Sequence, residues 1–216
     1  MAEHPDIAKT LSETNRYDQY VNEAITRYII IRNVGALEGF LRLMAAMIVD
    51  KNGVDFSKFF TDYHDFETML KKVNQSMGRR GRRKKLTKGQ FFASNFDFVN
   101  PDEINWVFSR LLGLKFFDTV KLINRYPLSQ PWRGSRGFVR NWKKFMKMFE
   151  WRHQIVHSME FVQISREELR SLCSNTLMFM EQASVLVDPP TGLGGNADQD
   201  YFFHVITEEK KRCSEE

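Results

Sequence analysis

Residues 138–158 have the sequence FVRNWKKFMKMFEWRHQIVHS. At about 100° per residue, its apolar side chains gather on one side of a helix. The predicted inward row consists of Phe138, Trp142, Phe145, Met146, Phe149 and Val156. The opposite side, extended back by one turn, carries Arg136, Arg140, Lys143, Lys144 and Lys147. The stretch therefore predicts a helix with one buried side and one cationic side.

A second long helix is predicted directly after this one. Ser165-Arg166-Glu167-Glu168 has the form of a capping box, in which a serine and a glutamate three residues later satisfy the first backbone N–H groups. The predicted inward side chains are Leu169, Leu172, Cys173, Thr176, Phe179, Met180, Ala183 and Val187. Pro189 and Pro190 end the helix, because proline cannot continue it.

Helical periods also fill the chain before residue 126. The first runs over 17–49 with a break near Gly35, and its predicted core residues are Val21, Ile25, Tyr28, Ile29, Ala36, Leu37, Phe40, Leu41, Met44, Met47 and Ile48. The second helical region runs over 56–77 with an internal boundary near Tyr63, and its predicted inward residues are Phe59, Phe60, Phe66, Met69, Leu70 and Val73. A third begins at Asn100-Pro101, a favourable cap and first helical residue, and a fourth covers 116–126.

These periods predict an all-α protein, a single helical bundle over residues 1–188 with a long basic loop. Residues 189–216 are predicted to form a flexible linker and a C-terminal tail. The chain has 216 residues, 42% of them hydrophobic, which is enough for one core. Cys173 and Cys213 match no paired metal or redox spacing, so free thiols in a reducing compartment are expected. No signal peptide or membrane span is predicted, which favours a cytoplasmic location.

The end of residues 138–158 carries side chains suited to chemistry. Arg152 and His157 would lie about 140° apart on a regular helix, on either side of the apolar row, with His153 near its centre line. An arginine beside a buried row is costly unless it is paired, so we expect an anionic ligand such as phosphate. Either a break in the helix just before Ser158 or a second copy of the chain would bring both side chains around one substrate.

The residues Arg152-His153-Gln154-Ile155-Val156-His157, followed by a short loop and a long capped helix, resemble the Arg-x4-6-His motif of HEPN domains. Ala36-Leu37-Glu38-Gly39-Phe40-Leu41 also resembles an early helix of the RiboL-PSP-HEPN branch. The resemblance covers about residues 15 to 188, with the motif region at 138–188. The family often has asparagine after the arginine, where this chain has His153.

The resemblance implies a metal-independent endoribonuclease, acting as a toxin or an anti-phage defence effector. The family places its motif at the cleft of a homodimer. In this chain His157 would move protons and Arg152 would stabilise charge on the phosphate, with His153 as a further catalytic candidate. RNA and a cognate antitoxin or defence-system protein are the implied partners, and no cofactor and no metal ion are expected.

Two basic segments are candidates for holding RNA by charge, in a chain with a net charge of +5. Residues 78–89, GRRGRRKKLTKG, have no apolar period and are predicted to form a solvated loop. The predicted RNA contacts are Arg79, Arg80, Arg82, Arg83, Lys84 and Lys85 in this run, and Arg140, Lys144 and Lys147 on the helix. Trp132 and Trp151 are weaker candidates for stacking on unpaired bases.

Three other interpretations of the motif stay open. Arg152 could pair with Glu150 or Glu160 in a purely structural role. The chain could be a non-catalytic HEPN module that binds RNA, a nucleotide or a protein partner. His153 and His157, four residues apart, could also share the ligand face of a metal site that His64 or Glu160 completes.

Overall fold

A computed structural model of the chain describes residues 5–60, 63–78, 85–123, 142–158 and 164–187, together with residues 207 and 211. Throughout these ranges the regular structure is helical and contains no strand, so the all-α prediction is confirmed. No helix within them is long and apolar enough to cross a membrane. Almost all of the predicted linker and tail, 189–216, lies outside the described residues.

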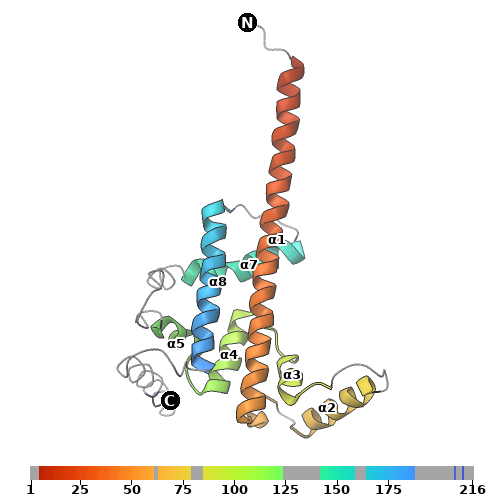
Figure 1. Ribbon diagram of the computed structural model, residues 1–216, viewed down its shortest axis with the longest axis vertical. Helices are drawn as coiled ribbons and strands as arrows, with labels where there is room; N and C mark the ends of the chain where they lie inside the picture. The colour runs from red at the N-terminus through yellow and green to blue at the C-terminus, as the bar shows by residue number, and fades with distance from the viewer. Residues whose placement is uncertain are drawn as a thin grey trace.

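The fold is organised around α1, a single helix over Pro5–Asn52. The predicted break near Gly35 is wrong, because the helix continues through Gly35 without interruption. The helix is followed by Gly53, whose φ of 63° is the left-handed conformation that commonly ends helices. Figure 1 shows α1 running the length of the molecule, with its N-terminal part extending beyond the other helices.

Only part of α1 belongs to the core. Its buried row consists of Ile30, Val34, Leu37, Leu41, Met44 and Ile48. Five residues that the sequence places inward are exposed instead: Val21, Ile25, Tyr28, Ala36 and Met47. The helical period is correct. Ala36 and Met47 lie between buried residues, on the side of α1 that faces solvent. At its N-terminal end, α1 is longer than the helices that pack on it. Its first turns therefore have no described element to cover them.

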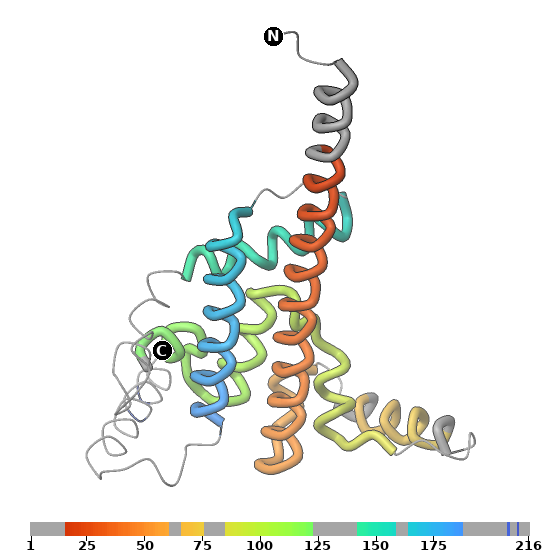
Figure 2. Tube along the Cα trace, turned by 45° about the horizontal axis from the view of Figure 1, so that its top comes forward, coloured from red at the N-terminus to blue at the C-terminus, as the bar shows by residue number. Residues whose placement is uncertain are grey.

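The other helices pack along the C-terminal part of α1. They are η1 (Phe56–Lys58), α2 (Tyr63–Gly78), α3 (Lys88–Ala93), α4 (Pro101–Leu112), α5 (Phe116–Ile123), α7 (Trp142–His153), the π-helical turn η2 (Gln154–Ser158) and α8 (Arg166–Val187). The predicted helix over 56–77 is thus divided into η1 and α2, and Met69, predicted inward, is exposed. Figure 2 shows α8 beside α1, with α7 running across both.

Aromatic rings form a continuous network of contacts through the core, and two groups within it join particular helices. One group joins η1, α2 and α3, where the rings of Phe56 and Phe66 stack with centroids 4.6 Å apart beside the fully buried Phe92. In the other group Phe145 of α7 stacks on Phe179 of α8, with centroids 4.9 Å apart. Burying a ring of this kind contributes about 1.5–3 kcal/mol. The second group holds α7 in place.

Two predicted helix starts are confirmed by their hydrogen bonds. The Asn100 side chain accepts from the Asp102 N–H at 3.0 Å and caps α4. At the start of α8, Ser165 Oγ accepts from the Glu168 N–H at 3.1 Å, and Glu168 Oε2 accepts from the Ser165 N–H at 3.2 Å. These are the reciprocal bonds of a capping box.

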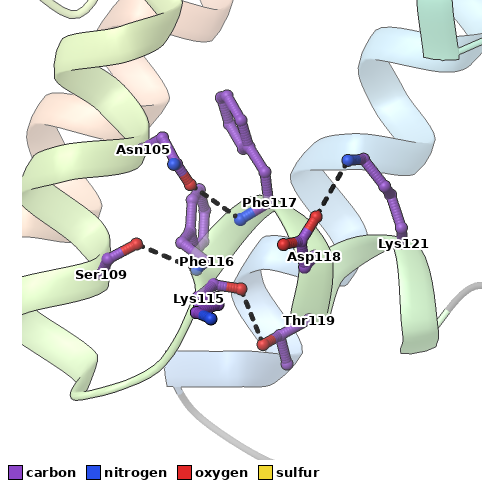
Figure 3. Close-up of polar contacts among 8 residues, drawn as sticks. All are labelled: Asn105, Ser109, Lys115, Phe116, Phe117, Asp118, Thr119 and Lys121. Carbon is purple, nitrogen blue, oxygen red and sulfur yellow. Dashed lines mark hydrogen bonds and ion pairs between the residues drawn. The ribbon is translucent and has the colours of Figure 1, made fainter. Parts of the chain in front are cut away.

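Side chains of α4 bind the first turn of α5 (Figure 3). Ser109 Oγ accepts from the Phe116 N–H, and Asn105 Oδ1 accepts from the Phe117 N–H, both at 3.0 Å. The first N–H groups of a helix have no partner within the helix, so these bonds satisfy them and fix the angle of the corner. The predicted continuation to residue 126 lies beyond Ile123, outside the described residues.

The basic run, predicted as a loop over 78–89, ends in a helix. α3 begins at Lys88 because Thr87 and Gln90 form a capping box. Thr87 Oγ1 accepts from the Gln90 N–H at 3.0 Å, and the Gln90 side chain accepts from the Thr87 N–H at 3.1 Å. Both ends of the run are therefore helical, since Gly78 is the last residue of α2, and residues 79–84 lie outside the described residues.

Gly89, in the first turn of α3, packs against the backbone of α1. A Cβ added there would come within 2.1 Å of the carbonyl oxygen of Ala46. The Gly89 N–H also donates to Asp50 Oδ1 at 2.8 Å. This residue is therefore a packing position between two helices and not a loop glycine.

Gly89→Ala is expected to lower the free energy of unfolding by about 3 kcal/mol, the upper end of the usual cost of overpacking. The cost is high because the added methyl group meets backbone, which cannot rotate away. Gly39→Ala is the matched control, since its Cβ meets nothing within 4 Å, and it should stabilise by about 0.5–1 kcal/mol. Urea unfolding followed by circular dichroism measures both. Equal urea midpoints for Gly89→Ala and wild type would contradict the contact between α3 and α1.

Candidate active site

A small polar cluster fixes where α7 crosses α1 and α8. Met148 of α7 is completely buried. Its sulfur accepts a hydrogen bond from Asn33 Nδ2 of α1 at 3.5 Å, and Asn33 also donates to Thr176 Oγ1 of α8 at 2.7 Å. Three helices meet at these side chains, so their packing fixes the direction in which α7 continues after Met148.

The buried row of α7 differs from the predicted row. Phe145 and Phe149 are buried as predicted, but Val156 is exposed, and Met148 and Ile155 are buried in its place. The physical reason is that α7 packs against both α1 and α8. Its buried side is therefore wider than a single stripe and extends toward Met148. Phe138 lies outside the described residues.

Arg152 continues this buried row. Phe145, Met148, Arg152 and Ile155 are spaced by three, four and three residues, which places them along one side of a helix. The sequence predicts Arg152 beside the row, whereas the structure places it in line with the row and partly buried. Among the residues described here, it makes no ion pair and no hydrogen bond. Its guanidinium is thus available to an external anion.

His153 and His157 lie against each other on the exposed side of the helix. Their ring centroids are 4.5 Å apart, and both side chains are exposed. The prediction that His153 lies near the centre of the apolar row is wrong, because the row extends toward Met148 and leaves His153 outside it. Histidine is the side chain that most often transfers protons in enzyme catalysis.

The helix changes geometry inside the motif. Gln154–Ser158 is a π-helical turn, whose hydrogen bonds span five residues and not four. Arg152 and His157 are five residues apart, so the wider turn reduces the separation of about 140° that a regular helix would give. The sequence predicts a break before Ser158 as one of two routes to a shared site, but nothing in it indicates a π turn. Such turns are rare and frequent at functional sites.

Two of the competing interpretations of the motif, the structural ion pair and the metal site, have little support in the described part of the chain. There Arg152 does not pair with Glu150, and Glu160 lies outside it. No group of three His, Cys, Asp or Glu side chains in that part could hold a metal ion. His64 belongs to α2, which lies toward the C-terminal end of α1, away from α7, in both views (Figures 1 and 2).

Cys173 is the other side chain near the motif helices with nucleophilic chemistry. It lies on α8 as a free thiol and is partly buried. Burial raises the pKa of the Cys173 thiol, which keeps it protonated and poorly nucleophilic. Cys173 is therefore a packing residue, and Cys213 lies outside the described residues.

Part of the predicted cationic side of α7 is described. Lys143, Lys144 and Lys147 are exposed. Lys144 Nζ lies 3.9 Å from a carboxylate oxygen of Glu168 on α8, a long and exposed ion pair that contributes little. Trp151 packs partly on the core, and Lys147 Nζ lies 5.4 Å from its ring centroid. The Trp151 ring thus already has packing partners, so its predicted role in base stacking is weakened.

Most of the other predicted RNA contacts lie outside the described residues: Arg79, Arg80, Arg82, Arg83, Lys84, Trp132, Arg136 and Arg140. Lys85 is described and exposed, just before α3. α3 packs on α1 at Ala46, and α7 meets α1 at Asn33. These positions are 13 residues apart, or about 20 Å at ~1.5 Å per residue. Lys85 and the motif therefore belong to separate parts of the surface.

A family model described as RiboL-PSP-HEPN matches residues 5–185 of the chain. The match begins with α1, includes the residues from Arg152 to His157, and ends near the end of α8. Neither a curated protein nor a solved structure matched the chain.

Proposed function

Because the chain belongs to the RiboL-PSP-HEPN family, we propose that it is a metal-independent endoribonuclease whose catalytic residues are Arg152, His153 and His157. The observation that carries this proposal is Arg152, a partly buried arginine with no ion-pair partner among the described residues, at the same end of α7 as an exposed pair of imidazoles. A cation in this position favours a negatively charged ligand. The phosphodiester of RNA is such a ligand, and the imidazoles beside it can transfer protons.

The proposed reaction is attack of a ribose 2′-hydroxyl on the adjacent phosphorus. His157 accepts the 2′ proton as the new oxygen–phosphorus bond forms. The bond to the 5′-oxygen of the next nucleotide breaks, and that oxygen receives a proton from His153. Arg152 stabilises the negative charge that builds on the phosphoryl oxygens. The products are a 2′,3′-cyclic phosphate and a 5′-hydroxyl end, and the step uses neither water nor a metal ion.

The basic side chains would hold the RNA backbone without selecting its sequence. Lys144 and Lys147 lie on α7, the helix that carries Arg152 and His153, and Arg140 precedes them in the sequence. Lys85 and residues 79–84 would bind a more distant part of the strand. Their contribution to affinity should fall as salt concentration rises, because phosphate contacts release counterions.

In a cell, such an activity would be that of a toxin or an anti-phage defence effector. Its active form would be a homodimer, and its partner a cognate antitoxin or a defence-system protein. The family resemblance is what supports these proposed roles. The exposure of His153 and His157 is compatible with control of this kind, because a protein partner can cover both rings directly.

The purified chain is expected to cleave single-stranded RNA at an unchanged rate in EDTA and to leave 2′,3′-cyclic phosphate and 5′-hydroxyl ends. The reason is that imidazole and guanidinium supply the proton transfer and the charge stabilisation. End-labelled RNA identifies the two new ends of the cut strand. A 5′-hydroxyl is recognised because polynucleotide kinase transfers phosphate from ATP to it directly. A reaction that EDTA stops and that leaves 5′-phosphates would assign the chemistry to a metal site. Binding of the same RNA without cleavage would favour the non-catalytic module.

A further inference from the structure

The N-terminal part of α1 presents a row of side chains to solvent. We call residues 16–32 the arm. Its N-terminal part extends beyond the other described helices in Figures 1 and 2, and its C-terminal part also carries the buried Ile30 on another side. The row consists of Asp18, Val21, Ile25, Tyr28 and Arg32, spaced alternately by three and four residues. Its three apolar members, in that order, expose 39%, 50% and 63% of their surface. Alternating spacing of this kind is the pattern by which two helices pair along a seam.

Further apolar side chains widen this row. Tyr17, Tyr20 and Ile31 are also exposed on the arm. The charged pair Glu23 and Arg27 lies one turn apart on the same helix and forms an ion pair with itself. Its charges are therefore already neutralised. An exposed apolar row of this length on a soluble helix marks an interaction surface.

The charges at the two ends of the row are complementary to each other. Asp18 and Arg32 each lie seven residues from Ile25, on opposite sides of it, and both are exposed. Neither forms an ion pair within the described ranges. In an antiparallel pair of arms centred on Ile25, Asp18 of each copy lies beside Arg32 of the other. A parallel pair would instead place like charges together, which is unfavourable.

We propose that the arm binds the arm of a second copy of this chain, antiparallel, with a two-fold axis at Ile25. α7 meets α1 at Asn33, eight residues from Ile25, or about 12 Å at ~1.5 Å per residue. In the pair, the two α7 contacts would therefore lie one on each side of the two-fold axis, about 24 Å apart along the arms. The pairing gives the homodimer of the proposed function a contact surface. The pairing rests on the proposed function only in this respect. Its test measures mass, so assembly and cleavage can fail separately.

Sedimentation equilibrium of the wild-type chain should give twice the chain mass. Ile25→Glu places a charge at the centre of the seam and should weaken dimerisation at least about a hundredfold, while circular dichroism stays helical. Leu177→Glu is the matched control, because Leu177 is 64% exposed on α8 and lies outside the arm. A wild-type monomer, or a dimer that Ile25→Glu leaves intact, would overturn the proposal.

A charge exchange tests the direction of pairing. In the antiparallel pair, either single variant, Asp18→Arg or Arg32→Asp, places like charges beside each other at both ends of the seam. Each single variant should therefore weaken the dimer at least about tenfold. The double variant should dimerise like wild type, and an equal mixture of the two single variants should form heterodimers. In a parallel pair the double variant and the single variants would behave alike. That result would overturn the antiparallel arrangement.

Discussion

RNA cleavage by Arg152→Ala and by His157→Ala is expected to fall at least about a hundredfold in kcat. Removal of His157 leaves the 2′-hydroxyl without its base. Loss of Arg152 removes the cation that stabilises charge on the phosphoryl oxygens. Single-turnover cleavage of a labelled RNA at saturating enzyme measures the chemical step, so weaker RNA binding does not enter the result.

Controls for this prediction must separate chemistry from folding, because Arg152 continues the row of Phe145, Met148 and Ile155. Circular dichroism and urea unfolding should show both variants folded. Arg152→Lys keeps the charge but loses the planar fork, so its rate should lie between those of wild type and alanine. Arg170→Ala removes an exposed arginine from α8 and should retain the wild-type rate. Folded alanine variants that cleave at that rate would exclude both residues from catalysis.

The sequence predicts the helix boundaries that depend on local side chains. The caps at Asn100 and Ser165 form because a side-chain oxygen lies within three residues of the N–H that it binds. The capping box of Thr87 and Gln90 is equally local. The charges of the basic run before it favour a loop, and a prediction based on those charges misses the cap.

Burial is harder to predict, because it depends on which neighbour reaches a helix face. Val21, Ile25 and Tyr28 have the spacing of core residues, yet they are exposed because α1 is longer than its partners. Met148 and Ile155 are buried because α7 packs on two helices, and one apolar stripe predicts contact with only one. Periodicity gives the face of a helix but not the number or length of its neighbours.

The candidate site likewise has features that the sequence predicts and one feature that it does not. Arg152 and His157 stand out in the sequence because an arginine beside an apolar row is costly. The contact between His153 and His157 follows from their spacing of four residues on one helix. The π turn does not follow from the sequence, because it depends on which carbonyl each N–H selects once the end of α7 is packed.

Mixing the two inactive variants is expected to restore cleavage. Within one chain Arg152 follows the buried row, whereas His157 lies on the exposed side against His153. We therefore expect each active site to combine the arginine of one copy with the histidine of the other. A mixed dimer of Arg152→Ala and His157→Ala then contains one complete site and one empty site. If chains pair at random in an equal mixture, about a quarter of wild-type activity should return.

The same mixture tests whether the arm forms the catalytic dimer. With Ile25→Glu added to both variants, cleavage should not return, since the chains no longer pair through the arm. A site complete within one chain predicts no activity in either mixture. Restoration that Ile25→Glu does not prevent would keep the shared site but place its dimer on a surface other than Val21, Ile25 and Tyr28. The mass of each mixture, measured in the same buffer, separates a failure to assemble from a failure of two assembled chains to share a site.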